Sequence, residues 1–168
     1  LEGNVPGADI GYYFPESKTL TVKKEERTGA WKDINYGGPA EAIKRTYTTM
    51  WFDHGVRPDQ DTYSYVLLPG LNKDQTHQYS QNPDITILRN HSSVQAVQDV
   101  KENIIGANFW KDEKQSVGPL TVYQKSSVTM QEKDGVLEIA VSDPTMENKG
   151  YIEIEIDGKA FEVLEADE

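Results

Sequence analysis

Apolar and polar residues alternate with period two along much of this sequence, and no other feature constrains the fold more. In the run from Tyr151 to Asp157 every second residue is isoleucine, and tyrosine or acidic residues lie between them. An earlier run has Leu137, Ile139 and Val141 at alternate positions. Because successive side chains of a strand point to opposite faces, each run predicts an antiparallel strand with one buried and one solvated face.

Turn signals divide the alternating runs into short strands. Asp134-Gly135 and Asp157-Gly158 each follow a run, and Asp-Gly favours tight hairpin turns. Further strands are predicted at Ile10–Phe14, Thr19–Lys24, Arg45–Asp53, Thr62–Leu68, Asp84–Arg89, Val94–Gln98, Asn103–Trp110, Leu120–Tyr123 and Val128–Gln131. Asn72 to Gln81 predicts a helix, since Asn72 can cap it with Gln75 and Pro83 follows its end. The sequence therefore predicts an all-β fold, an antiparallel β-sandwich with one short helix.

The charge of the chain is strongly negative and unevenly placed. The net charge is −11, and residues 132–168 hold twelve acidic residues against three lysines, a net charge of −9. A surface of that kind repels nucleic acids and anionic lipids, so neither is an expected partner. An acidic polysaccharide would have to bind elsewhere on the chain. The absence of cysteine excludes disulfides and thiolate metal sites.

No catalytic or metal-binding pattern is evident. His54, His77 and His91 are far apart and lack metal-ligand spacing, and there is no GxSxG motif. His54 follows a predicted strand, where a hydrogen-bonded turn residue is favoured over a catalyst. We predict no catalytic residue and no cofactor. A structural calcium ion in the acidic loops is conceivable but has no regular ligand spacing in support; those loops contain Asp59, Asp61, Asp143 and Glu147.

The segment from Arg27 to Asn35 is the candidate substrate-binding site. Arg27 can bind a carboxylate with two hydrogen bonds, Trp31 offers a flat face to a sugar ring, and Asn35 adds a polar group. The alternative is structural: a β-bulge with a buried tryptophan and an ion-paired arginine. Several tyrosines and Trp51 also lie on predicted strands, where they could line a carbohydrate platform or pack in the core.

Several segments together resemble polysaccharide lyase family 8, which contains hyaluronate, chondroitin AC and xanthan lyases. They follow one another in the family's order across almost the whole chain. The segments are Ile10–Pro15, Arg27–Asn35, Phe52–Gly55, Tyr63–Pro69, Val94–Val97, Gly106–Trp110 and Ala140–Thr145.

The resemblance implies a larger enzyme. In the family, a helical toroid precedes a large β-sandwich domain, or supersandwich, and a small C-terminal β-sandwich. Residues 1–86 would then be the end of the large β domain and residues 87–168 the small one. We expect the chain to begin within a longer, secreted bacterial protein, with the toroid and the rest of the β domain as its partners.

The implied reaction is β-elimination beside a uronic acid in hyaluronan, chondroitin or xanthan. An asparagine neutralises the uronate, a tyrosine or histidine removes the C5 proton, and a tyrosine protonates the leaving oxygen. Those groups lie on the toroid, so we predict that this chain alone is inactive and supports the fold and the cleft. A non-catalytic carbohydrate-binding β-sandwich module is the alternative, and an independent enzyme would need an acid/base group that the sequence does not reveal.

Overall fold

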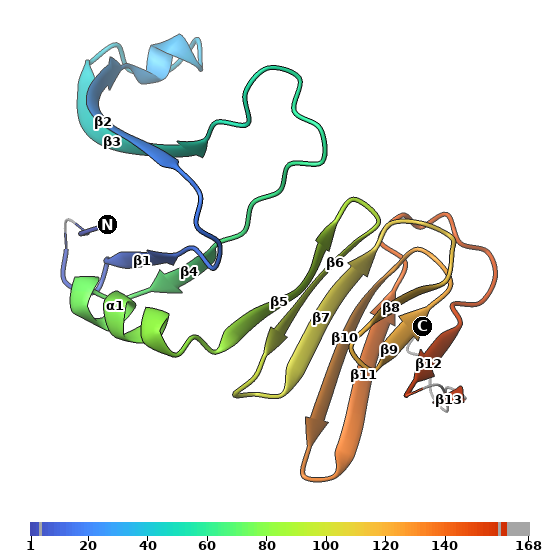
Figure 1. The fold of residues 1–168 in the computed structure, drawn as a ribbon. Coiled ribbons are helices and arrows are strands. Elements are labelled where there is room, and N and C mark those ends of the chain that lie inside the picture. The colour runs from blue at the N-terminus through green and yellow to red at the C-terminus, as the bar shows by residue number, and fades with distance from the viewer. Residues whose placement is uncertain (4, 158, 161–168) are drawn as a thin grey trace. The chain divides into compact units, whose positions relative to one another are not determined.

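The computed structural model describes residues 1–3, 5–157 and 159–160, and strands dominate it (Figure 1). The elements are β1 (Ile10–Tyr13), β2 (Leu20–Gly29), the 3-10 turn η1 (Trp31–Asp33), β3 (Ile43–Phe52), β4 (Val66–Pro69), α1 (Lys73–Gln81), β5 (Ile85–His91), β6 (Val94–Asp99), β7 (Ile104–Phe109), β8 (Gln115–Val117), β9 (Leu120–Val122), β10 (Ser126–Lys133), β11 (Val136–Ser142), β12 (Ile154–Ile156) and β13 (Lys159–Ala160). The chain forms two compact units, one of residues 16–63 and one of residues 1–15 with the described residues from 64 onward. The all-β prediction with one short helix is confirmed.

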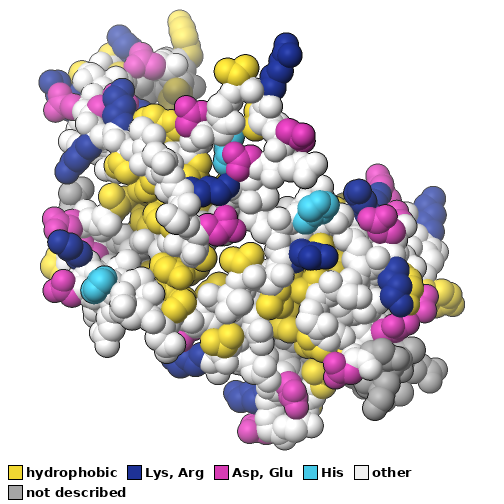
Figure 2. Space-filling model, viewed as in Figure 1, with side chains coloured by type: hydrophobic (Ala, Val, Ile, Leu, Met, Phe, Trp, Pro, Cys, Tyr) yellow, Lys and Arg dark blue, Asp and Glu magenta, His cyan; other side chains and the backbone are white. Residues whose placement is uncertain are grey.

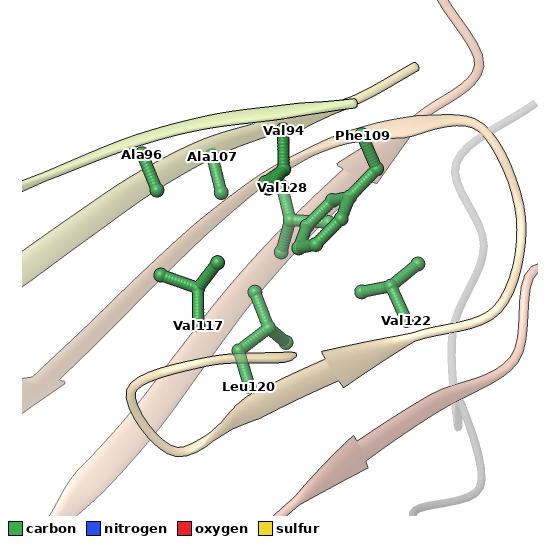
Figure 3. Packing of buried hydrophobic residues seen from close by; sticks show 8 residues of the cluster. All are labelled: Val94, Ala96, Ala107, Phe109, Val117, Leu120, Val122 and Val128. Carbon is green, nitrogen blue, oxygen red and sulfur yellow. The ribbon is translucent and has the colours of Figure 1, made fainter. Parts of the chain in front are cut away.

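Two antiparallel sheets form a sandwich in the second half of the chain. One has five strands in the order β11-β10-β7-β6-β5, and the other has the order β13-β12-β9-β8. Their facing side chains make two apolar clusters, and Figure 3 shows the larger one. Its buried members are Val94, Ala96, Ala107, Phe109, Val117, Leu120, Val122 and Val128.

Alternation along the strands explains this core. In β6, Val94 and Ala96 are buried while the residues that follow each of them are exposed. In β12, Ile156 is buried and Ile154 is partly buried against the core, which agrees with the predicted alternation over a shorter strand. Strand β8 was not predicted, because Gln115–Val117 is too short to show a period.

Strand β11 departs from the prediction. We expected Leu137, Ile139 and Val141 to form a buried face, but these side chains remain 38%, 36% and 38% exposed. The reason is position: β11 is the edge strand of the five-stranded sheet, and its side chains do not take part in the described core clusters. The alternation identified the strand correctly, but it could not show whether another layer covers that strand.

The predicted turns and helix cap are present. Asp134 and Gly135 have φ angles of 53° and 76° and join β10 to β11, as expected for an Asp-Gly hairpin turn. Asp157, with φ of 50°, leads from β12 toward β13, while Gly158 lies outside the described residues. The Asn72 side chain accepts a hydrogen bond from the Gln75 amide at 3.0 Å, and the Gln75 side chain accepts one from the Asn72 amide at 3.0 Å.

Helix α1 packs against the small sheet that β1 forms with β4. Tyr13 on β1 and Tyr79 on the helix stack edge to face, with ring centroids 5.6 Å apart. Gly11 is buried beneath Thr76, and a Cβ atom at Gly11 would lie 2.2 Å from the Thr76 hydroxyl oxygen. Helix and strand can approach this closely only with glycine at that position. No helix in the described part of the chain has the length and apolar character needed to cross a membrane.

The unit of residues 16–63 is built on a two-stranded ribbon. Strands β2 and β3 pair without a register shift from Leu20 opposite Phe52 to Gly29 opposite Ile43. A loop that contains η1 joins the strands at one end (Figure 1). This ribbon carries the candidate residues Arg27, Trp31 and Asn35.

Replacing Leu120 with alanine tests the position of the core. Leu120 is fully buried between the sheets, so Leu120→Ala is expected to lower the free energy of unfolding by about 2–5 kcal/mol. Leu67→Ala, which changes a side chain that is 50% exposed, provides the matched control and is expected to cost less. Urea unfolding followed by circular dichroism measures both. Equal losses for the two variants would contradict the assignment of this core.

Candidate functional site

Arg27 lies on β2 and is held by its neighbours on one face of the ribbon. Its Nε and Nη2 atoms donate to the Glu25 Oε1 atom at 3.0 and 2.7 Å, and Nη2 also donates to the Thr49 hydroxyl at 3.2 Å. The guanidinium carbon lies 5.3 Å from the centroid of the Tyr47 ring. Hydrogen bonds from Lys23 and Arg27 lower the pKa of Glu25. These contacts orient Arg27 while Nη1 contacts no acceptor among the described residues.

Trp31 and Asn35 lie in the loop after β2. The Trp31 carbonyl oxygen accepts hydrogen bonds from the Ile34 and Asn35 amides at 3.2 and 2.9 Å, and the Asp33 carboxylate accepts one from the Ala30 amide at 2.7 Å. The Asn35 side-chain oxygen accepts a bond from the Gly37 amide at 3.3 Å. The loop is therefore closed by local hydrogen bonds.

The three candidate residues share one hairpin but do not form one constellation. Trp31 and Asn35 are joined through the backbone of the same turn, whereas Arg27 contacts Glu25, Thr49 and Tyr47 on the strands. The structural alternative was a β-bulge with a buried tryptophan and an ion-paired arginine, and only its ion pair is present. Arg27 is ion-paired, but Trp31 is 55% exposed and the β2–β3 register is continuous, so there is neither a buried tryptophan nor a bulge.

His54 takes part in a second polar cluster of the same unit. Its Nδ1 atom lies 2.5 Å from the Asp61 Oδ2 atom, and Lys18 donates to Asp61 Oδ1 at 2.7 Å and to the Thr62 carbonyl. Hydrogen bonds from Lys18 and His54 lower the pKa of Asp61 to about 2. His54 is thus a hydrogen-bonded loop residue, as predicted. The sequence did not predict that Lys18 and Asp61 cluster with His54, because 43 positions separate Lys18 from Asp61.

Asp143 and His91 make local hydrogen bonds. Asp143 accepts hydrogen bonds from the Thr145 side chain and backbone at 2.6 and 2.9 Å and from the Asn148 amide at 2.8 Å. The Thr145 and Asn148 donors lower the pKa of Asp143 to about 2. His91 contacts the Ser93 hydroxyl at 3.0 Å. In the part of the chain that the structure describes, no three His, Asp or Glu side chains converge as a metal site.

Gly38 offers a test of the loop that holds Trp31. A Cβ atom on Gly38 would lie 2.8 Å from the Trp31 carbonyl carbon and 3.0 Å from the Asn35 carbonyl oxygen. Gly38→Ala is therefore expected to open the loop and to speed hydrogen exchange of the Asn35 amide. Gly37→Ala is the matched control, because its nearest atom would be 4.0 Å away. Unchanged Asn35 exchange in Gly38→Ala would refute this account of the loop.

The Asp61 cluster predicts a specific pH dependence. The folded pKa of Asp61 is below the ordinary 3.8, so its carboxylate stabilises the fold above that pH and the contribution is lost as pH falls toward 2. The Thr62 amide donates to Asp61 Oδ1 at 2.9 Å, and its NMR shift is expected to titrate with a midpoint near 2. Asp61→Asn should abolish this titration and Asp59→Asn should preserve it. A midpoint at the ordinary value would disprove the cluster.

Family comparisons match both halves of the chain. The sequence model for the polysaccharide lyase family 8 super-sandwich domain matches residues 3–80. The model for the family's C-terminal beta-sandwich domain matches residues 86–151. The two matches lie in chain order and together leave little of the chain unassigned.

Individual relatives agree with these matches. The chain is 46% identical over 160 residues to a xanthan lyase of Bacillus sp. (strain GL1), covering 93% of this chain and 17% of that protein. It is 37% identical over 135 residues to a hyaluronate lyase of Thermasporomyces composti, covering 80% of this chain and 17% of that protein. A solved Paenibacillus xanthan lyase superposes with a TM-score of 0.87 and 43% identity, over 92% of this chain and 15% of that chain. The chain thus spans about a sixth of the length of these relatives, and it belongs to polysaccharide lyase family 8, of which it covers the C-terminal β-sandwich region.

Proposed function

We propose that the chain is the β-region of a bacterial extracellular polysaccharide lyase that cleaves a uronic-acid-containing polysaccharide by β-elimination. In this proposal the chain supports the fold and the cleft, while the groups that move protons lie on a helical toroid in another part of the protein. The proposal rests on one observation. Both family domains match this chain, and the chain covers 17% of the length of the xanthan lyase from Bacillus sp.. Hyaluronan, chondroitin and xanthan are the candidate substrates.

The chemistry of the described residues supports a scaffold role. β-Elimination needs a base close to the C5 proton and a group that neutralises the uronate. The described α-helical structure consists of α1, nine residues long. Nothing in this part of the chain resembles a toroid that could hold the catalytic groups.

An exposed apolar side chain on the ribbon also supports a partner segment. Leu20, Val22, Met50 and Phe52 share one face, because residues paired across a ribbon share a face. Val22 is 55% exposed while the other three are partly buried, and Figure 2 shows hydrophobic side chains at the molecular surface. Two-stranded ribbons are marginal in water without a layer against them. The rest of the large β domain would provide that layer.

The domain division and the binding residues follow from the same proposal. Residues 1–86 would be the end of the large β domain and residues 87–168 the small sandwich. The boundary would lie near the start of β5, which pairs with β6. Trp31, with 55% of its surface exposed, would stack on a sugar ring. Arg27 and Asn35 would donate hydrogen bonds to the same polysaccharide.

An activity assay tests the proposal directly. The purified 168-residue chain is expected to release no unsaturated uronide from hyaluronan, chondroitin or xanthan, because the proposal places the proton-transfer groups on the toroid. The protein encoded by the complete gene is expected to release it from one of the three. Ultraviolet absorbance of the unsaturated product measures both reactions. Product from the short chain, or none from the complete protein with any of the substrates, would contradict the proposal.

A further inference from the structure

The two faces of the β2–β3 ribbon differ in chemistry. Side chains alternate between faces along each strand, and directly paired residues share a face. One face carries the apolar side chains described above at one end and Lys24, Glu26 and Lys44 further along. The other, here called the cationic face, is defined by Lys23, Glu25, Arg27, Arg45, Tyr47 and Trp51.

Side-chain contacts connect much of the cationic face into one surface. Lys23 Nζ lies 2.5 Å from Glu25 Oε2, Arg27 donates to Glu25 at 2.7 Å, and the Arg27 guanidinium covers part of the Tyr47 ring. Three cations against one carboxylate leave an excess of two positive charges. This excess is notable in a chain whose net charge is −11. The face would therefore attract an anion that the rest of the chain repels.

Arg45 is the cation of this face that lacks a carboxylate partner. It lies directly opposite Arg27 in the ribbon, and like charges at paired positions are destabilising. Its Nη1 atom donates to the Lys44 carbonyl oxygen at 2.7 Å, and no described carboxylate pairs with the side chain. A carboxylate placed between Arg27 and Arg45 would accept from both and remove the repulsion.

Two aromatic rings extend along the same face. Tyr47 and Trp51 are 49% and 42% exposed, and they are four residues apart on β3. The strand rise places them roughly 13 Å apart, so they match an extended chain better than a single sugar. Aromatic faces bind sugar rings, while arginine and lysine bind carboxylates. The cationic face combines both kinds of group in one row.

We infer that the cationic face binds an extended segment of an acidic polysaccharide, with its carboxylates at Arg27 and Arg45 and its sugar rings against Tyr47 and Trp51. This inference rests on the proposed function for the class of polysaccharide. It adds a binding surface on the strands of the ribbon, apart from the Trp31 and Asn35 loop. The charge excess and the unpaired Arg45 favour this occupant over another protein segment, which would have to bury those cations.

Neighbouring positions on β3 provide a matched pair of variants. Arg45→Gln removes one positive charge from the cationic face, and Lys44→Gln removes one from the opposite face, where Lys44 contacts Glu26 at 2.9 Å. Titration calorimetry of the complete protein with hyaluronan and xanthan fragments measures affinity, and dextran serves as a neutral probe. Arg45→Gln is expected to weaken binding about three- to fivefold, with little change for Lys44→Gln. Circular dichroism confirms that both variants fold.

Each result decides the inference. A selective loss in Arg45→Gln, with weaker binding at high salt and none to dextran, supports it. Equal losses in both variants would show nonspecific charge attraction and overturn it. Absence of binding by the unaltered complete protein would also overturn it, as would burial of Trp51 in that protein against another segment. Since uronide release by the complete protein is measured separately, the proposed function can survive failure of this surface.

Discussion

A two-stranded ribbon cannot bury its own side chains, and this constraint governs the N-terminal part of the molecule. Strands β2 and β3 are ten residues each, yet each has one neighbour and the ribbon has no described second layer. Its backbone ladder holds the register, but Val22 remains 55% exposed on the face that it shares with the partly buried Leu20, Met50 and Phe52. A segment with this structure is most simply understood as part of a larger sheet assembly.

The C-terminal sandwich, in contrast, buries apolar side chains between its own two sheets. Phe109, Leu120 and Val122 come from two facing sheets and are almost completely removed from water. The ribbon lies within residues 3–80, which match the super-sandwich domain, and Phe109, Leu120 and Val122 lie within residues 86–151, which match the C-terminal domain. The candidate binding residue Trp31 lies in the loop that joins the two strands of the ribbon and is 55% exposed.

Sequence predicted local features well where the residues involved are close together in the chain. Asn72 and Gln75 form the predicted cap, and Asp134-Gly135 forms the predicted turn. Both features depend only on residues that are close together in the sequence. The exposed face of β11 could not be predicted, since burial depends on whether a second sheet extends over the edge strand. The partners of Arg27 were missed for a related reason: Thr49 meets Arg27 only through the β2–β3 register.

Hydrogen exchange of the backbone amides most directly tests the claim that the ribbon is a supported part of a larger enzyme. The measurement compares β2–β3 amides in the 168-residue chain with the same amides in the complete protein. We predict fast exchange in the short chain and strong protection in the complete protein, with β6, β7 and β10 protected in both. Equal, strong protection of the ribbon in both forms would show that the ribbon needs no partner segment and would contradict the account.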